Sequence, residues 1–201
     1  MRRLAAAVLA CAVLASPAAA ASLAGIGAAI HGNGFNFSKP NLAKAPVSDI
    51  RLGTLGIKLQ STKLKDVQKS FGGTLRDDGN GLSGATWLCY NGDGFAVWLI
   101  SNALGGQEFV MMVAAETVSR PYGACDAAPA GLTPPEFGIP GIGASSAEVK
   151  ASFGAASGNK LSYRNDRPGG YSDTAQYIGY VLKAGKVSAL GVGETQVPTA
   201  H

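Results

Sequence analysis

The chain has 201 residues, 28 of them glycine, with 17 Lys and Arg against 13 Asp and Glu and only two His. Its 46% hydrophobic and 15% charged residues exclude the composition of a disordered chain and suffice for a packed core. His31 and His201 lie near the chain ends, which argues against histidine-based triads and His-rich metal sites. We therefore expect no metal and no cofactor.

The first twenty residues have the layout of a secretory signal peptide. Met1-Arg2-Arg3 is basic, residues 4–15 are apolar, and Ala18-Ala19-Ala20 forms an Ala-x-Ala site, so cleavage is expected after residue 20 or 21. The apolar run is too short to cross a bilayer, which predicts no transmembrane span. Removing residues 1–20 takes Arg2 and Arg3 but none of the 13 acids, and a net charge of +2 indicates no nucleic-acid partner. We expect a periplasmic or extracellular protein.

Export also predicts the state of the cysteines. Cys11 lies in the signal peptide, so Cys89 and Cys125 remain as an even pair in an oxidising compartment. A reactive thiol is the competing interpretation, but no His or CxxC partner supports it. We therefore predict a disulfide between Cys89 and Cys125.

Two stretches rich in small residues and breakers divide the rest of the chain. Residues 21–48 are rich in Gly, Ala and Asn without a sustained period, which predicts a flexible or loosely docked lead-in. Residues 118–134 contain several prolines and predict a linker. These stretches delimit a first segment, residues 49–117, and a second segment, residues 135–197, and residues 198–201 form a tail.

The two segments are similar to each other. Gly56-Ile57 near the start of the first matches Gly138-Ile139 in the second, 82 residues later, and both are followed by Val, Phe and Gly at helical spacing. Both segments close on Glu-Thr, at Glu116-Thr117 and Glu194-Thr195. Matches at both ends favour an internal duplication.

Each repeat is expected to begin with a short helix and to continue with strands. Ser145 followed by Glu148 is a capping box, and Thr62 is the expected cap of the corresponding first helix. The expected strands are residues 86–90, 95–100, 109–115, 160–164, 176–182 and 186–192, with turns at 91–94 and 184–185. The fold class is therefore α+β, a tandem repeat of a short helical segment followed by a small antiparallel β-sheet.

The helix entry of the second repeat carries a resemblance. Gly138-Ile139-x-Gly141-Ile142-Gly143-x-Ser145-x-x-Glu148-Val149-x-x-x-Phe153-Gly154 resembles the opening of bacterial envelope domains of the SmpA/OmlA type. The tandem arrangement is similar to that of beta-lactamase inhibitory protein. The resemblance implies an exported, non-catalytic role in protein binding or assembly.

The apolar strands of the first repeat supply candidate binding residues. Residues 95–100 and 109–115 are apolar on both faces, so an outer row must be covered by the second repeat, by the lead-in or by a separate partner. That row is predicted to contain Trp98, Ile100, Met111 and Val113. Strand tyrosines of the second repeat are either half-buried or part of a face for protein or sugar. The candidate binding residues are Trp87, Tyr90, Trp98, Met111, Tyr163 and Tyr177.

Known catalytic motifs are absent from the sequence. It contains no Gly-x-Ser-x-Gly elbow and no HExxH, and no Cys has a His that could plausibly reach it. We expect no enzyme but an exported binding protein that recognises another protein in the bacterial envelope or outside the cell. The alternatives are a carbohydrate- or peptidoglycan-binding module and a carboxylate-dependent hydrolase that uses Glu116 and Glu194.

Overall fold

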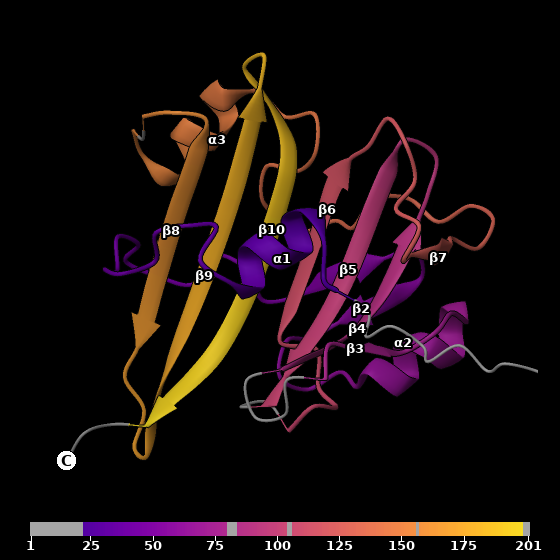
Figure 1. Cartoon of the computed structure of the whole chain (residues 1–201). Coiled ribbons are helices and arrows are strands. Elements are labelled where there is room, and N and C mark those ends of the chain that lie inside the picture. Colours follow the sequence, from indigo (N-terminus) through magenta and orange to yellow (C-terminus); the bar gives the residue numbers. More distant parts are fainter. Residues whose placement is uncertain (1–21, 80–83, 104–105, 156, 199–201) are drawn as a thin grey trace, which may run out of the picture.

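A computed structural model shows one large β-sheet with helices on both of its faces (Figure 1). The structure describes residues 22–79, 84–103, 106–155 and 157–198. The predicted signal peptide, residues 1–20, lies outside the described residues. The predicted mixed α+β fold is confirmed.

The large sheet has the strand order β3-β4-β5-β6-β10-β9-β8, with antiparallel neighbours throughout, and β7 pairs in parallel with β4. Its strands are β3 (Arg76–Asp77), β4 (Ala85–Asn91), β5 (Phe95–Asn102), β6 (Met112–Thr117), β7 (Asp126–Ala127), β8 (Lys160–Arg167), β9 (Ser172–Lys183) and β10 (Lys186–Pro198). Strands β6 and β10 pair in the middle of the sheet, where Val113 lies opposite Val192. The two segments of the chain therefore share one sheet.

One face of the sheet, here called the inner face, carries the larger hydrophobic core. Helices α2 (Leu64–Phe71) and α3 (Ser146–Phe153) contribute to it, as does the hairpin of β1 (Ile50–Leu52) and β2 (Leu55–Ile57). The predicted capping box is confirmed, because Ser145 Oγ accepts from Glu148 N and Glu148 Oε2 accepts from Ser145 N at 2.7 Å. The predicted Thr62 cap is wrong, since α2 has Lys63 as its N-cap and Thr62 Oγ1 accepts from Lys58 N instead.

Residues 22–47 are here called the strap; their first part covers the opposite face of the sheet, which we name the strap face, and their last residues pack on the inner face. The strap contains α1 (Gly25–His31), whose Ile26 and Ile30 are buried against the sheet. Helix α1 contacts β5, β6 and β10. From residue 22 onward, the lead-in expected to be flexible or loosely docked is docked on the sheet, and of the three candidates for covering the apolar face of the first segment, the lead-in covers it.

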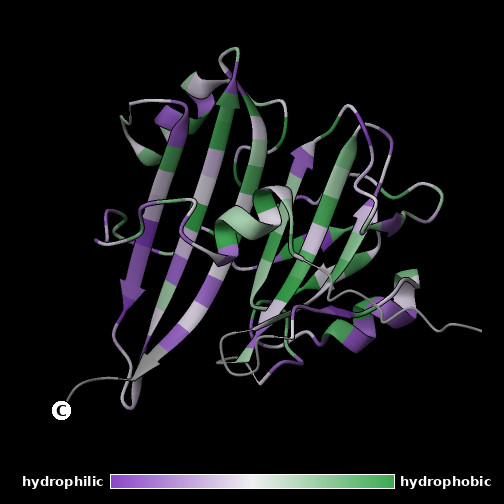
Figure 2. Ribbon diagram, viewed as in Figure 1, coloured by the Kyte–Doolittle hydropathy of each residue, from purple (hydrophilic) through white to green (hydrophobic). Residues whose placement is uncertain are grey.

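The distribution of hydropathy follows from these two layers. Strands β4, β5 and β6 are hydrophobic almost throughout, whereas β8, β9 and β10 alternate between hydrophobic and polar residues (Figure 2). A strand that is covered on both faces must be apolar on both. Strands β4, β5 and β6 of the first segment are therefore covered on both faces, and the strands of the second segment are more open to solvent.

Candidate functional site

Five of the six predicted binding residues lie in the protein core. Trp87, Tyr90, Trp98, Met111 and Tyr163 are each at most 3% exposed. These five residues are not surface anchors in this structure, because the strap and the inner-face helices cover the strands that carry them.

The register of β5 with β6 also corrects the predicted outer row. Ala114 lies opposite Trp98, and Val113 lies opposite Leu99 on the inner face. Met112 takes the place expected for Val113 on the strap face, next to Met111. The prediction for Val113 failed because a shift of one residue along a strand moves a side chain to the other face.

Tyr177 is the sixth predicted residue, and the strap covers part of it as well. Its ring lies 5.1 Å from the ring of Phe37, measured between centroids. Burial raises the pKa of the Tyr177 hydroxyl. Tyr180 is buried on the inner face, and among the described residues Tyr171 is the large hydrophobic residue that stays exposed. The strand tyrosines therefore form no open aromatic face.

The two carboxylates considered for a hydrolase are separated by the sheet. Glu116 lies on the strap face, where its Oε1 accepts from Tyr122 Oη at 2.7 Å and from Ile26 N at 3.2 Å. Glu194 lies on the inner face and accepts from Gln60, Gln176 and Arg167. Acid–base chemistry on a single substrate needs two carboxyl groups within several ångströms on the same side. Glu116 and Glu194 do not form such a pair.

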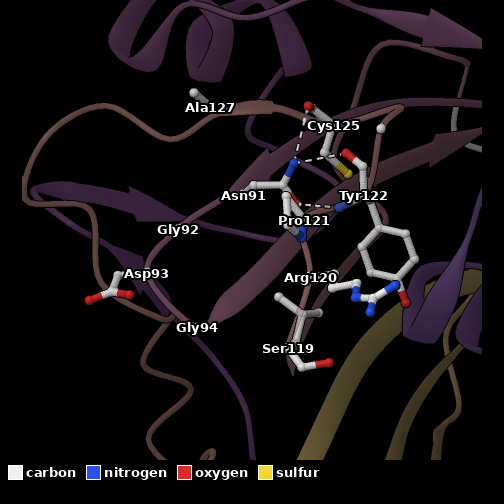
Figure 3. A pocket seen from close by; sticks show the side chains of 12 residues that line it. Asn91, Gly92, Asp93, Gly94, Ser119, Arg120, Pro121, Tyr122, Cys125 and Ala127 are labelled. Carbon is white, nitrogen blue, oxygen red and sulfur yellow. Dashed lines mark hydrogen bonds between the residues drawn. The ribbon is translucent and has the colours of Figure 1, made fainter.

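An open cleft of about 660 Å³ lies at the end of the β4–β5 hairpin (Figure 3). One wall is the hairpin turn, residues 91–94, and the other is residues 118–127, here called the disulfide loop. The sequence predicted a linker for residues 118–134 and a disulfide from Cys125, but no binding site in this loop. A cysteine inside a proline-rich stretch was the signal that could have marked it as an anchored, structured loop.

The disulfide loop is attached to β4 at Cys89 and Asn91, which are two residues apart on the strand. Cys125 forms the predicted disulfide with Cys89, with a Cα–Cα distance of 4.7 Å. Asn91 holds the loop from inside: its Nδ2 donates to the carbonyls of Tyr122 (2.8 Å) and Cys125 (3.2 Å), and its Oδ1 accepts from Tyr122 N (2.9 Å). A partly buried amide with this many backbone partners holds a loop in one conformation.

A second set of contacts anchors the far end of the loop. Asp126 accepts two hydrogen bonds from the Arg76 guanidinium (2.8 and 3.2 Å) and one from Thr74 N (2.7 Å). The hydrogen bond from Arg76 is the main cause that lowers the pKa of the Asp126 carboxyl. Next to this pair, Tyr90 donates to Gly72 O, and burial raises the pKa of Tyr90 to about 12.

Tyr122 of the disulfide loop lines the cleft and connects the loop to the rest of the molecule. Its ring packs edge-on against Trp98 at 5.2 Å between centroids, and its hydroxyl donates to Glu116. Burial and that hydrogen bond raise the pKa of Tyr122 to about 12, so the hydroxyl stays protonated at neutral pH. The loop is thus connected through Tyr122 to the strap, because Glu116 also binds Ile26 N.

The tip of the disulfide loop remains exposed despite these anchors. Ser119, Arg120 and Pro121 are exposed, as is Asp93 on the facing turn. Within the described residues, neither Arg120 nor Asp93 forms an ion pair. Figure 3 shows the two side chains on opposite sides of the cleft. A fixed backbone therefore presents one free cation and one free anion to solvent.

The described part of the chain holds no group of three or more His, Cys, Asp and Glu side chains that could bind a metal ion. No helix within it is long and apolar enough to cross a membrane. Comparison with family models, curated proteins and solved structures finds no match to the chain. The resemblance to SmpA/OmlA-type domains and to beta-lactamase inhibitory protein stays a prediction.

Proposed function

We propose that this protein is an exported, non-enzymatic binding protein that recognises another protein through its disulfide loop and the facing β4–β5 turn. The observation that carries the proposal is the combination of a firmly anchored backbone with an exposed tip at Ser119, Arg120 and Pro121. A loop that is already ordered loses little conformational entropy when it binds, and exposed arginines are frequent anchors of protein interfaces.

Two further observations support recognition by a loop rather than by a sheet. The strap occupies the β8 edge of the large sheet, and the opposite edge consists of the two-residue strands β3 and β7, which both pair with β4. The aromatic residues of the strands are buried or covered. We propose a periplasmic or extracellular location, for which the Cys89–Cys125 disulfide is suited, after removal of a signal peptide.

We also propose that the chain arose by duplication. In each half a helix on the inner face precedes antiparallel strands, β3 to β6 in the first half and β8 to β10 in the second, and the last strands of the two halves, β6 and β10, lie side by side. The closing Glu-Thr pairs are not equivalent in space, because Glu116 and Glu194 lie on opposite faces. The alignment of the repeats therefore needs a shift of one residue before these pairs.

Site-specific photo-crosslinking in the producing cells tests the proposed interface. A crosslinking residue at Ser119 is expected to capture one protein, and the same residue at Lys150, exposed on α3 of the other half, is expected to capture none. Arg120→Glu should weaken the Ser119 crosslink by about tenfold, because it reverses the charge at the tip of the loop. Lys150→Glu serves as the matched control. Equal capture from both positions, or a crosslink that Arg120→Glu leaves unchanged, would contradict the proposal.

A further inference from the structure

The strap passes from one face of the sheet to the other around strand β8. On the strap face, α1 lies on β6 and β10, and Phe37 then packs against Tyr177 of β9. On the inner face, the backbone of Val47 exchanges two hydrogen bonds with the side chain of Gln176 (2.7 and 3.1 Å). Figure 1 shows this course, in which the indigo segment crosses β9 and β8, turns beyond β8 and returns behind the sheet.

Strand β8 lies at the edge of the sheet, and Asn41 of the strap occupies that edge. The Asn41 Oδ1 accepts from Arg164 N (2.8 Å), and its Nδ2 donates to Ser162 O (3.0 Å). The backbone amides of Asn41 and Leu42 both donate to Arg164 O at 2.9 Å. One side chain and two amides thus bind the backbone groups that a neighbouring strand would bind.

A second copy of β8 would fit the same groups. In an antiparallel pair centred on Tyr163, Ser162 of one copy lies opposite Arg164 of the other, and these residues exchange both backbone hydrogen bonds. The same register places Lys160 of one copy opposite Asp166 of the other, which forms two ion pairs across the junction. The β8 edge is therefore complementary to itself in hydrogen bonding and in charge.

The same groups hold the strap in the closed molecule. Lys160 Nζ donates to Gly34 O (3.5 Å), and the Arg164 guanidinium donates to Phe37 O (2.8 Å) while it pairs with Asp166. A strap and a second β8 would compete for Lys160, Arg164 and Asp166. Occupation by one therefore excludes the other.

The strap depends on its docking for its structure. Helix α1 has only seven residues, its N-cap Ala24 makes no side-chain hydrogen bond, and it contains Gly25 and Gly27. An isolated helix this short is unstable in water. Loss of a few docking contacts should therefore release the whole segment rather than a single turn.

We propose that the strap blocks a self-association edge, and that its release lets two copies of this chain pair through β8 into one continuous sheet. With the strap docked the protein is a monomer. The occupant of the released edge is the β8 strand of the second copy, chosen by the self-complementary register about Tyr163.

Sedimentation velocity of the mature chain with Asn41→Ala tests this proposal. The wild type is expected to stay monomeric, and the variant is expected to dimerise about tenfold more tightly or better, because two hydrogen bonds of the strap are lost. Adding Lys160→Asp should abolish the dimer by placing two aspartates opposite each other. Adding Asp166→Lys to that variant should restore the dimer.

Three results overturn the proposal. A dimer that Lys160→Asp leaves unchanged is an exchange of straps or unspecific association through the exposed strap face. If Asn41→Ala is monomeric, a second variant combines it with Gly27→Leu, so that the docking of the strap is weakened near both of its ends. Hydrogen exchange at residues 22–42 then reports whether the strap is released. A folded monomer with a released strap shows that the β8 edge does not self-associate, and a dimerised wild type shows that the docked strap does not block it.

Discussion

Replacing both Cys89 and Cys125 with alanine is expected to lower the free energy of unfolding by about 4 kcal/mol. The two cysteines are 36 residues apart. In the chain-entropy model, removing the disulfide raises the conformational entropy of the unfolded state, which stabilises that state by about 4 kcal/mol. Chemical denaturation of the mature protein, followed by tryptophan fluorescence, measures the change. The slope with denaturant should also rise, because a chain without the crosslink exposes more surface when it unfolds.

A reduced wild type is the control for this variant. In the presence of a strong reductant, the wild type should unfold at the same denaturant concentration as the double alanine variant. The disulfide loop should keep most of its native position in the variant, since Asn91 and the Asp126–Arg76 pair still hold it. An unfolding free energy within about 1 kcal/mol of the oxidised wild type would show that these polar contacts, rather than the disulfide, stabilise the loop.

Gly27→Leu is expected to undock α1 and to destabilise the protein by about 3 kcal/mol. This figure is roughly the free energy lost when Ile26 and Ile30 are no longer buried, minus the free energy that leucine gains over glycine in helix propensity. A Cβ atom on Gly27 would lie 2.8 Å from Cγ of Trp98, at the rigid base of the indole. That ring has no room to move, because Tyr122 packs against its edge and β5 is buried on both sides. Leucine favours helix formation over glycine, so the loss would come from the contact alone.

Fluorescence and a neighbouring substitution test this prediction. Trp87 and Trp98 both lie on the strap face, so undocking of α1 should shift their emission to longer wavelength under native conditions. Ala28→Leu places the same side chain on the next residue of α1, which is partly exposed and outside the strap-face cluster, and should leave the emission unchanged. If both variants behave alike, close contact at Gly27 is not what holds the helix.

The elements with strong local signals could be predicted. Ser145 and Glu148 define the start of α3 because the capping box lies within four consecutive residues. The turn at Ala184-Gly185 has positive φ at both residues (50° and 75°), as a tight hairpin requires, and it joins β9 to β10 as expected. The Cys89–Cys125 pairing was predicted from the expected export and from the even number of cysteines outside the predicted signal peptide.

The site could not be predicted in the same way. Aromatic and apolar strand residues such as Trp98 can be either core or interface, and their type does not distinguish the two. Trp98 belongs to the core because α1 covers it. The sequence of α1 has too little hydrophobic periodicity to predict a helix, and its close packing depends on the absence of a side chain at Gly27. The anchoring of the disulfide loop depends on Asn91. In the sequence Asn91 has only the pattern of a turn residue, because its partners Tyr122 and Cys125 lie 31 and 34 residues away.

The sequence by itself determined the α+β class, the order of the main strands, the capping box and the disulfide, because each depends on neighbouring residues or on composition. Only the tertiary structure decided which face each strand residue occupies, what covers Trp98, and that Glu116 and Glu194 lie on opposite sides of the sheet. Strand register and the docking of the strap depend on contacts between residues far apart in the chain. A shift of one position, as at Val113, changes the environment of a side chain completely without changing the local pattern.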